Sequence, residues 1–341
     1  MKAIPVREAV GLTLCHDITE IVPGGRKGPA FRRGHVVRDE DVEHLLRLGK
    51  EHLYVWDTRN GDLIHEDDAA RRIATATAGP GLVLGEPKEG RINFTAAYQG
   101  LVRINLDLLT QINLVPDASL ATVHTLQEAE AGRTVAGTRV IPLVVPASVP
   151  EAVETLCREH GPVISILPFA SPRVGVITTG GEVFHGRIKD AFTPVLQRKL
   201  ESWGCAFHFH QTVPDKVEET VKAVQNALEA GSELVLLTGG MSVDPDDKTP
   251  GAIRAVADRV VTYGSPVFPG AMFMLAYKGE VPIMGLPGCV MYHRASVFDL
   301  IMPRILAGLD VTREDIAGLG HGGLCDSCPE CRFPLCGFGK G

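Results

Sequence analysis

The stretch LVLLTGGMSVDPDD (Leu234–Asp247) decides how this sequence folds and where its polar chemistry gathers. An apolar run ends in Thr238, two glycines and a serine, and three aspartates follow within four positions. A strand of nearly continuous apolar residues is typical of a parallel sheet that is covered on both faces. Ligands of such sheets bind at the carboxyl ends of the strands. The polar end of this strand is therefore the first candidate site.

The segments around this strand alternate between strand and helix patterns. Strands are predicted for residues 173–179, 205–212 and 233–238, and helices for residues 191–204, 216–231 and 249–257. Asp215 and Glu218 form a start signal of the capping-box kind for the second of these helices. The alternation predicts an α/β fold, a parallel-sheet domain of three layers over residues 171–310.

The remaining sequence predicts smaller regions on either side of this domain. Residues 1–80 indicate an α+β region with a helix over Asp39–Gly49 and a strand HLYVW directly after it. Residues 81–170 indicate a β-rich middle region of short strand runs, followed by a helix at 150–160 and a strand at 163–168. Residues 311–341 form a cysteine-rich tail.

Composition narrows the classes of protein that this chain resembles. Its 341 residues are 45% hydrophobic and 22% charged, which is ordinary for a globular protein. A net charge of −7 argues against nucleic acid as a partner. No apolar run approaches the ~20 residues of a membrane span, and the start does not resemble a signal peptide, so we expect a cytoplasmic protein that binds no membrane. A basic cluster, Arg26, Lys27, Arg32 and Arg33, fits either a solvated loop or a small-anion contact.

Two strands of the predicted sheet end in the same way. One ends in Thr179, Gly180 and Gly181, and the other in Thr238, Gly239 and Gly240 with Ser242 two positions later; we expect these residues to bind a ligand. Paired glycines let the backbone come close to a bound group. Exposed backbone N–H groups and hydroxyls suit a phosphate or a similar oxyanion.

Acidic residues accompany both turns and need an explanation beside a bound anion. They are Glu182, Asp190, Asp244, Asp246 and Asp247. Carboxylates bind Mg²⁺ through one or two oxygens while a ligand phosphate supplies others. Alternatively, Asp246 or Asp247 caps the helix that begins near Thr249. We expect one capping acid and at least one functional acid.

Four motifs together resemble the molybdopterin-binding domain, of the MoaB/Mog type, found in molybdopterin molybdotransferases. The motifs are TGGEV (Thr179–Val183), IKD (Ile188–Asp190), GGMSV (Gly239–Val243) with Asp247 after it, and GLPGCV (Gly285–Val290). The resemblance implies a pterin-phosphate ligand, molybdopterin or the finished molybdenum cofactor, with Pro287 and Gly288 added to the binding residues. It also implies that Glu182, Asp190 and Asp247 handle metal or adenylylated pterin. A homo-oligomer is expected, with a molybdenum enzyme or another cofactor-biosynthesis protein as partner.

The sequence also departs from that family. Gly181 stands where the family has an aspartate, and Phe268–Met272 replaces a KPGKP motif, so two lysines are absent. The DNSAMDGYA signature is not found, although Arg7–Thr19 resembles the family's opening segment. We expect no counterpart of the family's C-terminal barrel after Leu309. These departures favour a non-catalytic carrier or sensor of the cofactor as the alternative to molybdate insertion, and whether the chain is an enzyme stays open.

A second family shares the acidic turn. DPDDKT (Asp244–Thr249) resembles the corresponding turn of competence-damage-inducible proteins, whose domain of the same fold hydrolyses nucleotide pyrophosphates. Asp246, Asp247 and Thr249 fit that pattern. A nucleotide pyrophosphatase is therefore the second alternative function.

The tail places four thiols in twelve residues. Cys325, Cys328, Cys331 and Cys336 follow the spacing C-x2-C-x2-C-x4-C. Thiolates at this spacing converge on an iron–sulfur cluster or a zinc ion, and chance placement or disulfides are the alternatives. The last gap is one residue longer than in bacterial ferredoxins. The other four cysteines, Cys15, Cys157, Cys205 and Cys289, are expected to be small buried apolar residues.

Overall fold

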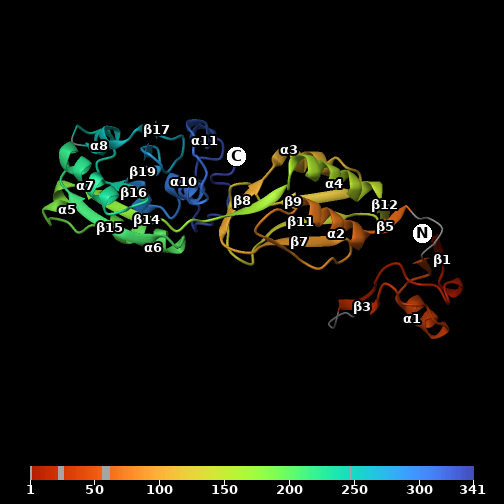
Figure 1. The fold of residues 1–341 in the computed structure, drawn as a ribbon. Coiled ribbons are helices and arrows are strands. Elements are labelled where there is room, and N and C mark those ends of the chain that lie inside the picture. The colour runs from red at the N-terminus through yellow and green to blue at the C-terminus, as the bar shows by residue number, and fades with distance from the viewer. Residues whose placement is uncertain (1, 22–26, 56–61, 246) are drawn as a thin grey trace. The chain divides into compact units, whose positions relative to one another are not determined.

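The computed structural model describes residues 2–21, 27–55, 62–245 and 247–341 (Figure 1). The chain separates into two compact units. Unit 1 comprises Met1–Ala97, Ile104–Val123 and Ala131–Ser165, and unit 2 comprises Tyr98–Arg103, His124–Glu130 and Ile166–Gly341. The long C-terminal segment of unit 2 begins at Ile166. No helix in the described part of the chain is long and apolar enough to cross a membrane.

Unit 1 begins with a small α+β region. Its elements are β1 (Lys2–Pro5), the 3-10 helix η1 (Val6–Glu8), β2 (Ile18–Ile21), β3 (Lys27–Phe31), the 3-10 helix η2 (Asp39–Asp41), α1 (Val42–Arg47) and β4 (His52–Val55). Strand β1 pairs antiparallel with β4, and β2 pairs antiparallel with β3. Leu14, Leu45 and Leu53 are enclosed in its core. The helix predicted over Asp39–Gly49 is present as η2 followed by α1, and Trp56 of the predicted strand lies outside the described residues.

The rest of unit 1 is built around an antiparallel sheet. Its elements are β5 (Leu63–His65), α2 (Glu66–Thr77), β6 (Leu82–Leu84), β7 (Arg91–Ala96), α3 (Leu106–Asn113), β9 (Ala118–Thr122), β11 (Thr134–Val140), β12 (Val144–Pro146) and α4 (Ser148–His160). The sheet order is β6-β7-β11-β9, and β12 pairs with β5. The β-rich prediction is confirmed, but helix α3 interrupts the runs that were predicted to be strands only. Its N-cap is Asn105, whose side chain accepts a hydrogen bond from the N–H of Leu108.

Three further strands form a separate small sheet. They are β8 (Gly100–Ile104), β10 (Glu128–Ala129) and β13 (Ile164–Pro168), in the order β10-β8-β13.

Unit 2 contains the α/β domain predicted from the sequence. Its elements are β14 (Arg173–Thr179), α5 (Gly181–Phe184), α6 (Phe192–Ser202), β15 (Ala206–Val213), α7 (Val217–Glu229), β16 (Leu234–Thr238), α8 (Thr249–Val256), β17 (Arg259–Tyr263), β18 (Met274–Lys278), β19 (Val281–Leu286), α9 (Cys289–Tyr292), α10 (Val297–Leu306) and α11 (Arg313–Gly318). The sheet order is β15-β14-β16-β19-β18-β17. The pairings from β15 to β19 are parallel, whereas β18 pairs antiparallel with both β19 and β17. The predicted α/β fold is confirmed, and its sheet is mixed at one edge.

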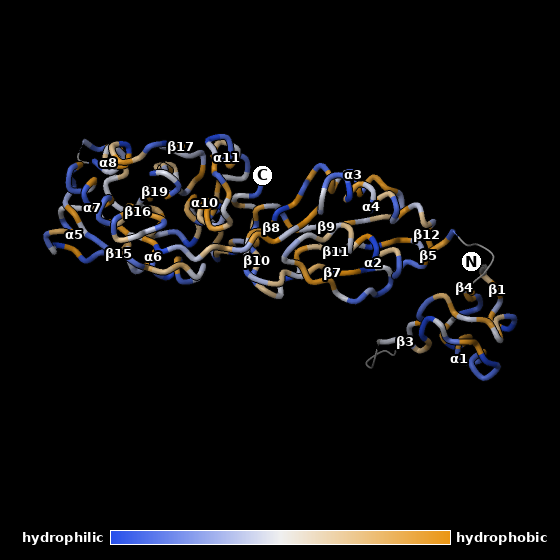
Figure 2. The backbone as a smooth tube through the Cα atoms, in the orientation of Figure 1, coloured by the Kyte–Doolittle hydropathy of each residue, from blue (hydrophilic) through white to orange (hydrophobic). Residues whose placement is uncertain are grey.

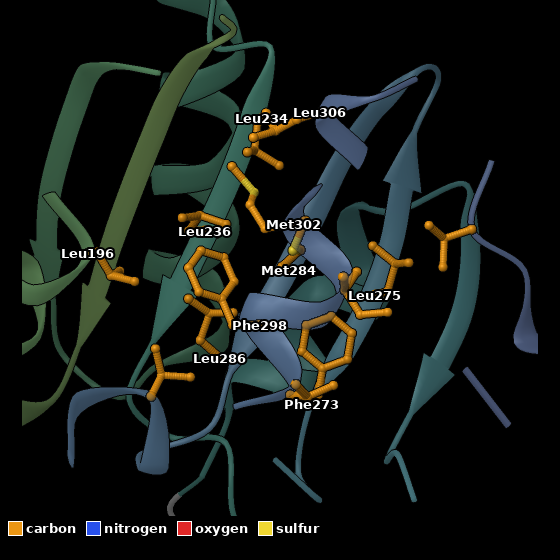
Figure 3. Close-up of a cluster of buried hydrophobic side chains, with 14 of the residues drawn as sticks. Leu196, Leu234, Leu236, Phe273, Leu275, Met284, Leu286, Phe298, Met302 and Leu306 are labelled. Carbon is orange, nitrogen blue, oxygen red and sulfur yellow. The ribbon is translucent and has the colours of Figure 1, made fainter. Parts of the chain in front are cut away.

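Alternate residues of the central strand belong to two different cores, which makes the domain three layers thick. Leu234 and Leu236 pack with α6 and α10, in the cluster that Figure 3 shows with Leu196 and Phe298. Val235 and Leu237 pack on the other face, in a cluster with residues of α7 and α8. Figure 2 shows the same pattern, with apolar residues along the strands and α10 and hydrophilic residues in the outer loops. Because both faces are buried, the strand ends are the part of the sheet left to meet a ligand.

Leu236→Ala is predicted to destabilise unit 2 strongly. The leucine side chain is fully buried, so its truncation removes apolar contacts and leaves a cavity, at a cost of about 2–5 kcal/mol. Val243→Ala is the matched control, because Val243 is 77% exposed and its truncation should change the free energy of unfolding by less than about 0.5 kcal/mol. Urea unfolding measures both values, and equal small effects would contradict the packing described above.

Candidate functional site

The register of three neighbouring strands brings the predicted turns to one edge of the sheet. Strand β14 pairs with β16 up to Thr178↔Thr238, and β16 pairs with β19 up to Thr238↔Leu286. The three strands therefore end side by side. The ends of these strands and the turns after them carry all nine residues predicted to bind a ligand, Thr179, Gly180, Gly181, Thr238, Gly239, Gly240, Ser242, Pro287 and Gly288.

The two glycines after β16 are required by the protein's own packing. Gly239 and Gly240 have φ angles of +85° and +55°, in the left-handed region that favours glycine. A Cβ atom at Gly239 would lie 2.1 Å from the carbonyl oxygen of Thr179, and one at Gly240 would lie 2.9 Å from Oγ1 of Thr249. This turn therefore packs closely against the end of β14 and the start of α8, and this packing does not depend on a ligand.

The threonine hydroxyls at this edge are buried. Oγ1 of Thr179 lies 3.1 Å from Oγ1 of Thr249, and Thr249 donates a hydrogen bond to the carbonyl oxygen of Gly239 at 2.9 Å. Thr238 is fully buried, and its Oγ1 has no hydrogen-bond partner among the described residues. Ser242, in contrast, is exposed. Of the three predicted hydroxyls, Ser242 is the one that reaches solvent. Thr179 and Thr249 link the two turns through their hydroxyls.

Asp190 is the centre of a dense hydrogen-bond network. Its Oδ1 accepts hydrogen bonds from the backbone N–H groups of Phe192 and Thr193, at 2.8 and 3.1 Å. Its Oδ2 accepts from the hydroxyls of Thr178, at 3.0 Å, and of Thr193. Burial opposes ionisation of this carboxyl, but the hydrogen bonds outweigh it and hold the pKa of Asp190 below its ordinary value.

His210 joins the same network from the neighbouring strand β15. Its Nε2 lies 3.2 Å from the hydroxyl oxygens of both Thr178 and Thr193, and 3.7 Å from Oδ2 of Asp190. The sequence analysis did not single out Thr178, Thr193 or His210. The available signals were the hydroxyl before the TG turn and the alternation FHFH in β15, but the strand order that brings them to Asp190 is not encoded in a local pattern.

Asp215 has a different role from the one predicted. Helix α7 has Lys216 as its N-cap, with no side-chain hydrogen bond at the cap. The Oδ2 atom of Asp215 instead accepts a hydrogen bond from the backbone N–H of Gly181, at 2.7 Å. The predicted capping box is therefore wrong. The carboxylate fixes the first glycine turn, because a free N–H at the start of α5 is a stronger attraction than a cap on its own helix.

The other acids lie around the turns with few protein partners. Glu182 is exposed in α5, and Asp244 is exposed in the loop before α8. The N–H of Asp247 donates to the carbonyl oxygen of Asp244, and the N-cap of α8 is Lys248, which makes no side-chain cap. Asp247 therefore does not cap α8, and Asp246 lies outside the described residues. Among described residues, no three His, Cys, Asp or Glu side chains stand close enough to hold one metal ion.

The cysteines divide into two groups, as the sequence suggests. Cys15, Cys157 and Cys205 are buried and Cys289 is half-buried, and all eight thiols are free. Burial raises the pKa of Cys157 and of Cys205 to about 11, so these thiols stay protonated at neutral pH. The four tail cysteines line a common cavity.

The predicted basic cluster is only partly described. Arg26 lies outside the described residues, and the side chain of Lys27 is likewise not described. Arg33 pairs with Asp68, with Nη2 and Oδ2 3.0 Å apart. This ion pair supports the solvated-loop interpretation for Arg33.

A larger cavity lies at the opposite edge of the sheet. It has a volume of about 570 Å³ and is lined by residues before and after the amino ends of the strands, among them Pro172, Glu233, Arg259 and Pro282. Arg259 forms an ion pair with Asp310 there, with Nη2 and Oδ1 2.8 Å apart. Because ligands of open α/β sheets bind at the carboxyl ends of the strands, size alone does not make this cavity the candidate site.

Part of unit 2 is similar to a known family of domains. Residues 175–307 match the family model described as "Probable molybdopterin binding domain". This segment is therefore similar to molybdopterin-binding domains. Residues 3–57 match a second model, described as a domain of unknown function.

Several known proteins are similar to this domain. A molybdopterin molybdenumtransferase of Staphylococcus aureus is 27% identical over 124 residues, which are 34% of this chain and 29% of that protein. The enzyme of Synechococcus elongatus is 28% identical over 137 residues, 37% of this chain and 33% of that protein. The chain thus spans about a third of the length of these relatives. The MoaB structure from Thermus thermophilus has 23% identity and a TM-score of 0.35, covering 40% of this chain and 97% of that one.

Asp190→Asn is predicted to destabilise unit 2 in a pH-dependent way. A carboxyl whose pKa is lowered by folding stabilises the protein above its ordinary pKa of 3.8, and this contribution is lost as the pH falls through the folded-state pKa. The substitution should therefore cost about 1–3 kcal/mol at pH 7, and less as the pH falls below 3.8.

Urea unfolding from pH 7 down to the lowest pH at which both proteins stay folded measures this difference. Glu182→Gln is the control, since its exposed carboxylate should contribute less than about 0.5 kcal/mol at every pH. A cost for Asp190→Asn that stays constant across the range would show that the charge is not what stabilises the network.

Proposed function

We propose that the molybdopterin-binding domain of this chain binds molybdopterin or its adenylylated form at the carboxyl edge of the sheet, and that the protein acts in the biosynthesis or handling of the molybdenum cofactor. The observation that carries the proposal is the strand register. It places TGGEV, GGMSV and GLPGCV beside one another, and Asp190 is fixed near the end of β14 by a hydrogen bond from Thr178. The exposed Ser242 hydroxyl at this edge suits the phosphate of such a ligand.

The geometry of the acidic residues supports molybdopterin binding more than molybdate insertion. Both oxygens of Asp190 already accept two hydrogen bonds each, so this carboxylate positions the edge and has little capacity left for a metal. Glu182 and Asp247 remain for metal chemistry, with Mg²⁺ as the cation that carboxylates and a ligand phosphate would share. A carrier or sensor of the cofactor is therefore the first form of the proposal, and a molybdotransferase is the second. A homo-oligomer and a partner from the same pathway rest on the family resemblance.

A nucleotide pyrophosphatase is the second candidate function. A protein of Halothermothrix orenii named as competence-damage inducible is 35% identical over 81 residues, 24% of this chain and 19% of that protein. Of the residues that fit the family's acidic turn, Thr249 is buried and its hydroxyl donates to Gly239. Thr249 is therefore placed to hold the turn. Release of phosphate or nucleoside monophosphate from nucleotide pyrophosphates by the purified protein would favour this function.

Gly288→Ala is predicted to weaken molybdopterin binding without disturbing the fold. Gly288 is exposed at the N-cap of α9 with a φ angle of −54°, and an added Cβ atom meets nothing within 4 Å. The methyl group therefore enters the space in front of the edge, and binding should weaken at least about tenfold, or 1.4 kcal/mol. Gly240→Val would be a poor probe, because its side chain meets Thr249 first.

Equilibrium binding of anaerobically prepared molybdopterin measures this effect. Gly318→Ala is the matched control, since its added Cβ atom also meets nothing within 4 Å and α11 carries none of the predicted site residues. Equal affinities of wild type and Gly288→Ala, with both proteins folded, would remove the GLPGCV turn from the binding site.

Asp247→Asn is predicted to separate chemistry from binding. If Asp247 handles Mg²⁺ or molybdate, formation of the molybdenum cofactor from molybdopterin and molybdate should fall at least tenfold, while molybdopterin affinity stays within twofold. Since Asp247 does not cap α8, the free energy of unfolding should change by less than about 0.5 kcal/mol. Cofactor formation by the variant at the wild-type rate would contradict a catalytic role for Asp247 and leave the carrier form of the proposal.

A further inference from the structure

The four tail cysteines line one cavity in unit 2. The cavity has a volume of about 250 Å³, and Cys325, Cys328, Cys331 and Cys336 all contribute to its wall. Residues 292–295, from the last residue of α9 into the loop before α10, form another part of the wall. None of the four thiols is in a disulfide. The four cysteines whose spacing predicts a ligand set therefore line one cavity in the fold.

The tail is held firmly against the domain. The N–H of Cys325 donates to the carbonyl oxygen of Phe268 at 2.9 Å, and the N–H of Phe268 donates to Gly323 at 2.8 Å. Phe338 is only 4% exposed and belongs to the same core as α10. A Cβ atom at Gly339 would lie 2.3 Å from a methyl carbon of Leu300, so the end of the tail is in close contact with α10. The wall of the cavity is therefore preformed.

The spacing of the cysteines and their shared cavity favour one of two kinds of metal centre. A zinc ion with four Zn–S bonds of about 2.3 Å draws its four sulfurs to within about 3.8 Å of one another. No group of three such ligands stands together among the described residues. In a four-iron cluster each cysteine binds a different iron atom, so the sulfurs stand farther apart around the cluster. Three cysteines separated by two residues resemble the ligands of bacterial ferredoxins, and all four line one cavity, which favours the second arrangement.

We propose that this cavity holds a four-iron iron–sulfur cluster bound by Cys325, Cys328, Cys331 and Cys336. Assembly takes two ferrous ions, two ferric ions and four sulfide ions from solution, and each cysteine exchanges its S–H bond for an Fe–S bond and releases one proton. The cluster neutralises four thiolates that would otherwise repel one another and oxidise readily. This proposal is independent of the ligand at the strand ends.

The test compares metal content in the full-length protein purified anaerobically and reconstituted with iron and sulfide. Wild type should contain about four iron and four sulfide per chain and show broad visible absorption that bleaches on reduction. Cys328→Ser should lower the iron content at least fourfold. Cys328 is the exposed member of the set, so its replacement should leave the fold intact, which circular dichroism checks.

Cys289→Ser is the matched control. Cys289 is half-buried, lies three residues before Tyr292 at the cavity wall and does not itself line the cavity. Its variant should keep the iron and sulfide of wild type. Gly288→Ala should also keep the cluster, so failure of the cluster and failure of molybdopterin binding are measured separately.

Three outcomes would overturn the proposal. One is about one zinc and no sulfide per chain, which would assign the thiols to a single ion. Another is absence of metal after reconstitution with all four thiols free. The third is full iron content in a folded Cys328→Ser protein, which would place the cluster on other ligands.

Discussion

The parallel pairing of β14, β16 and β19 is the constraint on which the rest of unit 2 depends. Leu234 and Leu236 enter one core while Val235 and Leu237 enter the other, so the strand must keep its register to bury both sets. A shift of one residue would exchange the two faces. The same register aligns Thr178, Thr238 and Leu286, and with them the turns that follow. The same strand register is therefore required for packing of the core and for assembly of the candidate site.

Most polar groups at this edge are engaged in hydrogen bonds within the protein and are not free to bind a ligand. Asp190 collects four hydrogen bonds, Asp215 holds the N–H of Gly181, and Thr179 meets Thr249. Such groups stay buried only because they are satisfied in this way. Motif residues and ligand contacts are consequently different sets. The groups left at the surface are Ser242, Gly288 and the acids Glu182 and Asp247, and these are the positions where substitutions should change chemistry more than stability.

The sequence predicted the parts of the fold that depend on local pattern. Apolar runs and their polar ends located β14 and β16, because both strands are buried on two faces. Helix α3 was missed because the eight residues LDLLTQIN are too few to tell a helical repeat of apolar residues from that of a strand. The partner of Asp215 was missed because a capping box and a tertiary acceptor have the same local sequence. His210 was missed because strand order, which brings β15 beside β14, is decided by contacts far apart in the chain.

The departure from the molybdotransferase family at Phe268–Met272 coincides with the attachment of the tail. Where that family has two lysines that could meet an anion, this chain has Phe268, whose backbone forms both hydrogen bonds to Gly323 and Cys325. In sequence, the cavity of the cysteines is joined to the candidate ligand edge by α9, which begins directly after Gly288 and ends at Tyr292 in the cavity wall. A group bound at either end of α9 can change affinity at the other only if it favours one position of that helix, and the effect must then be equal in both directions. The loss of positive charge at Phe268–Met272 and the metal centre proposed beside α9 thus both concern the segments that attach the tail to the domain. The molybdopterin affinity of proteins with and without the cluster measures whether the cysteine cavity and the ligand edge are coupled.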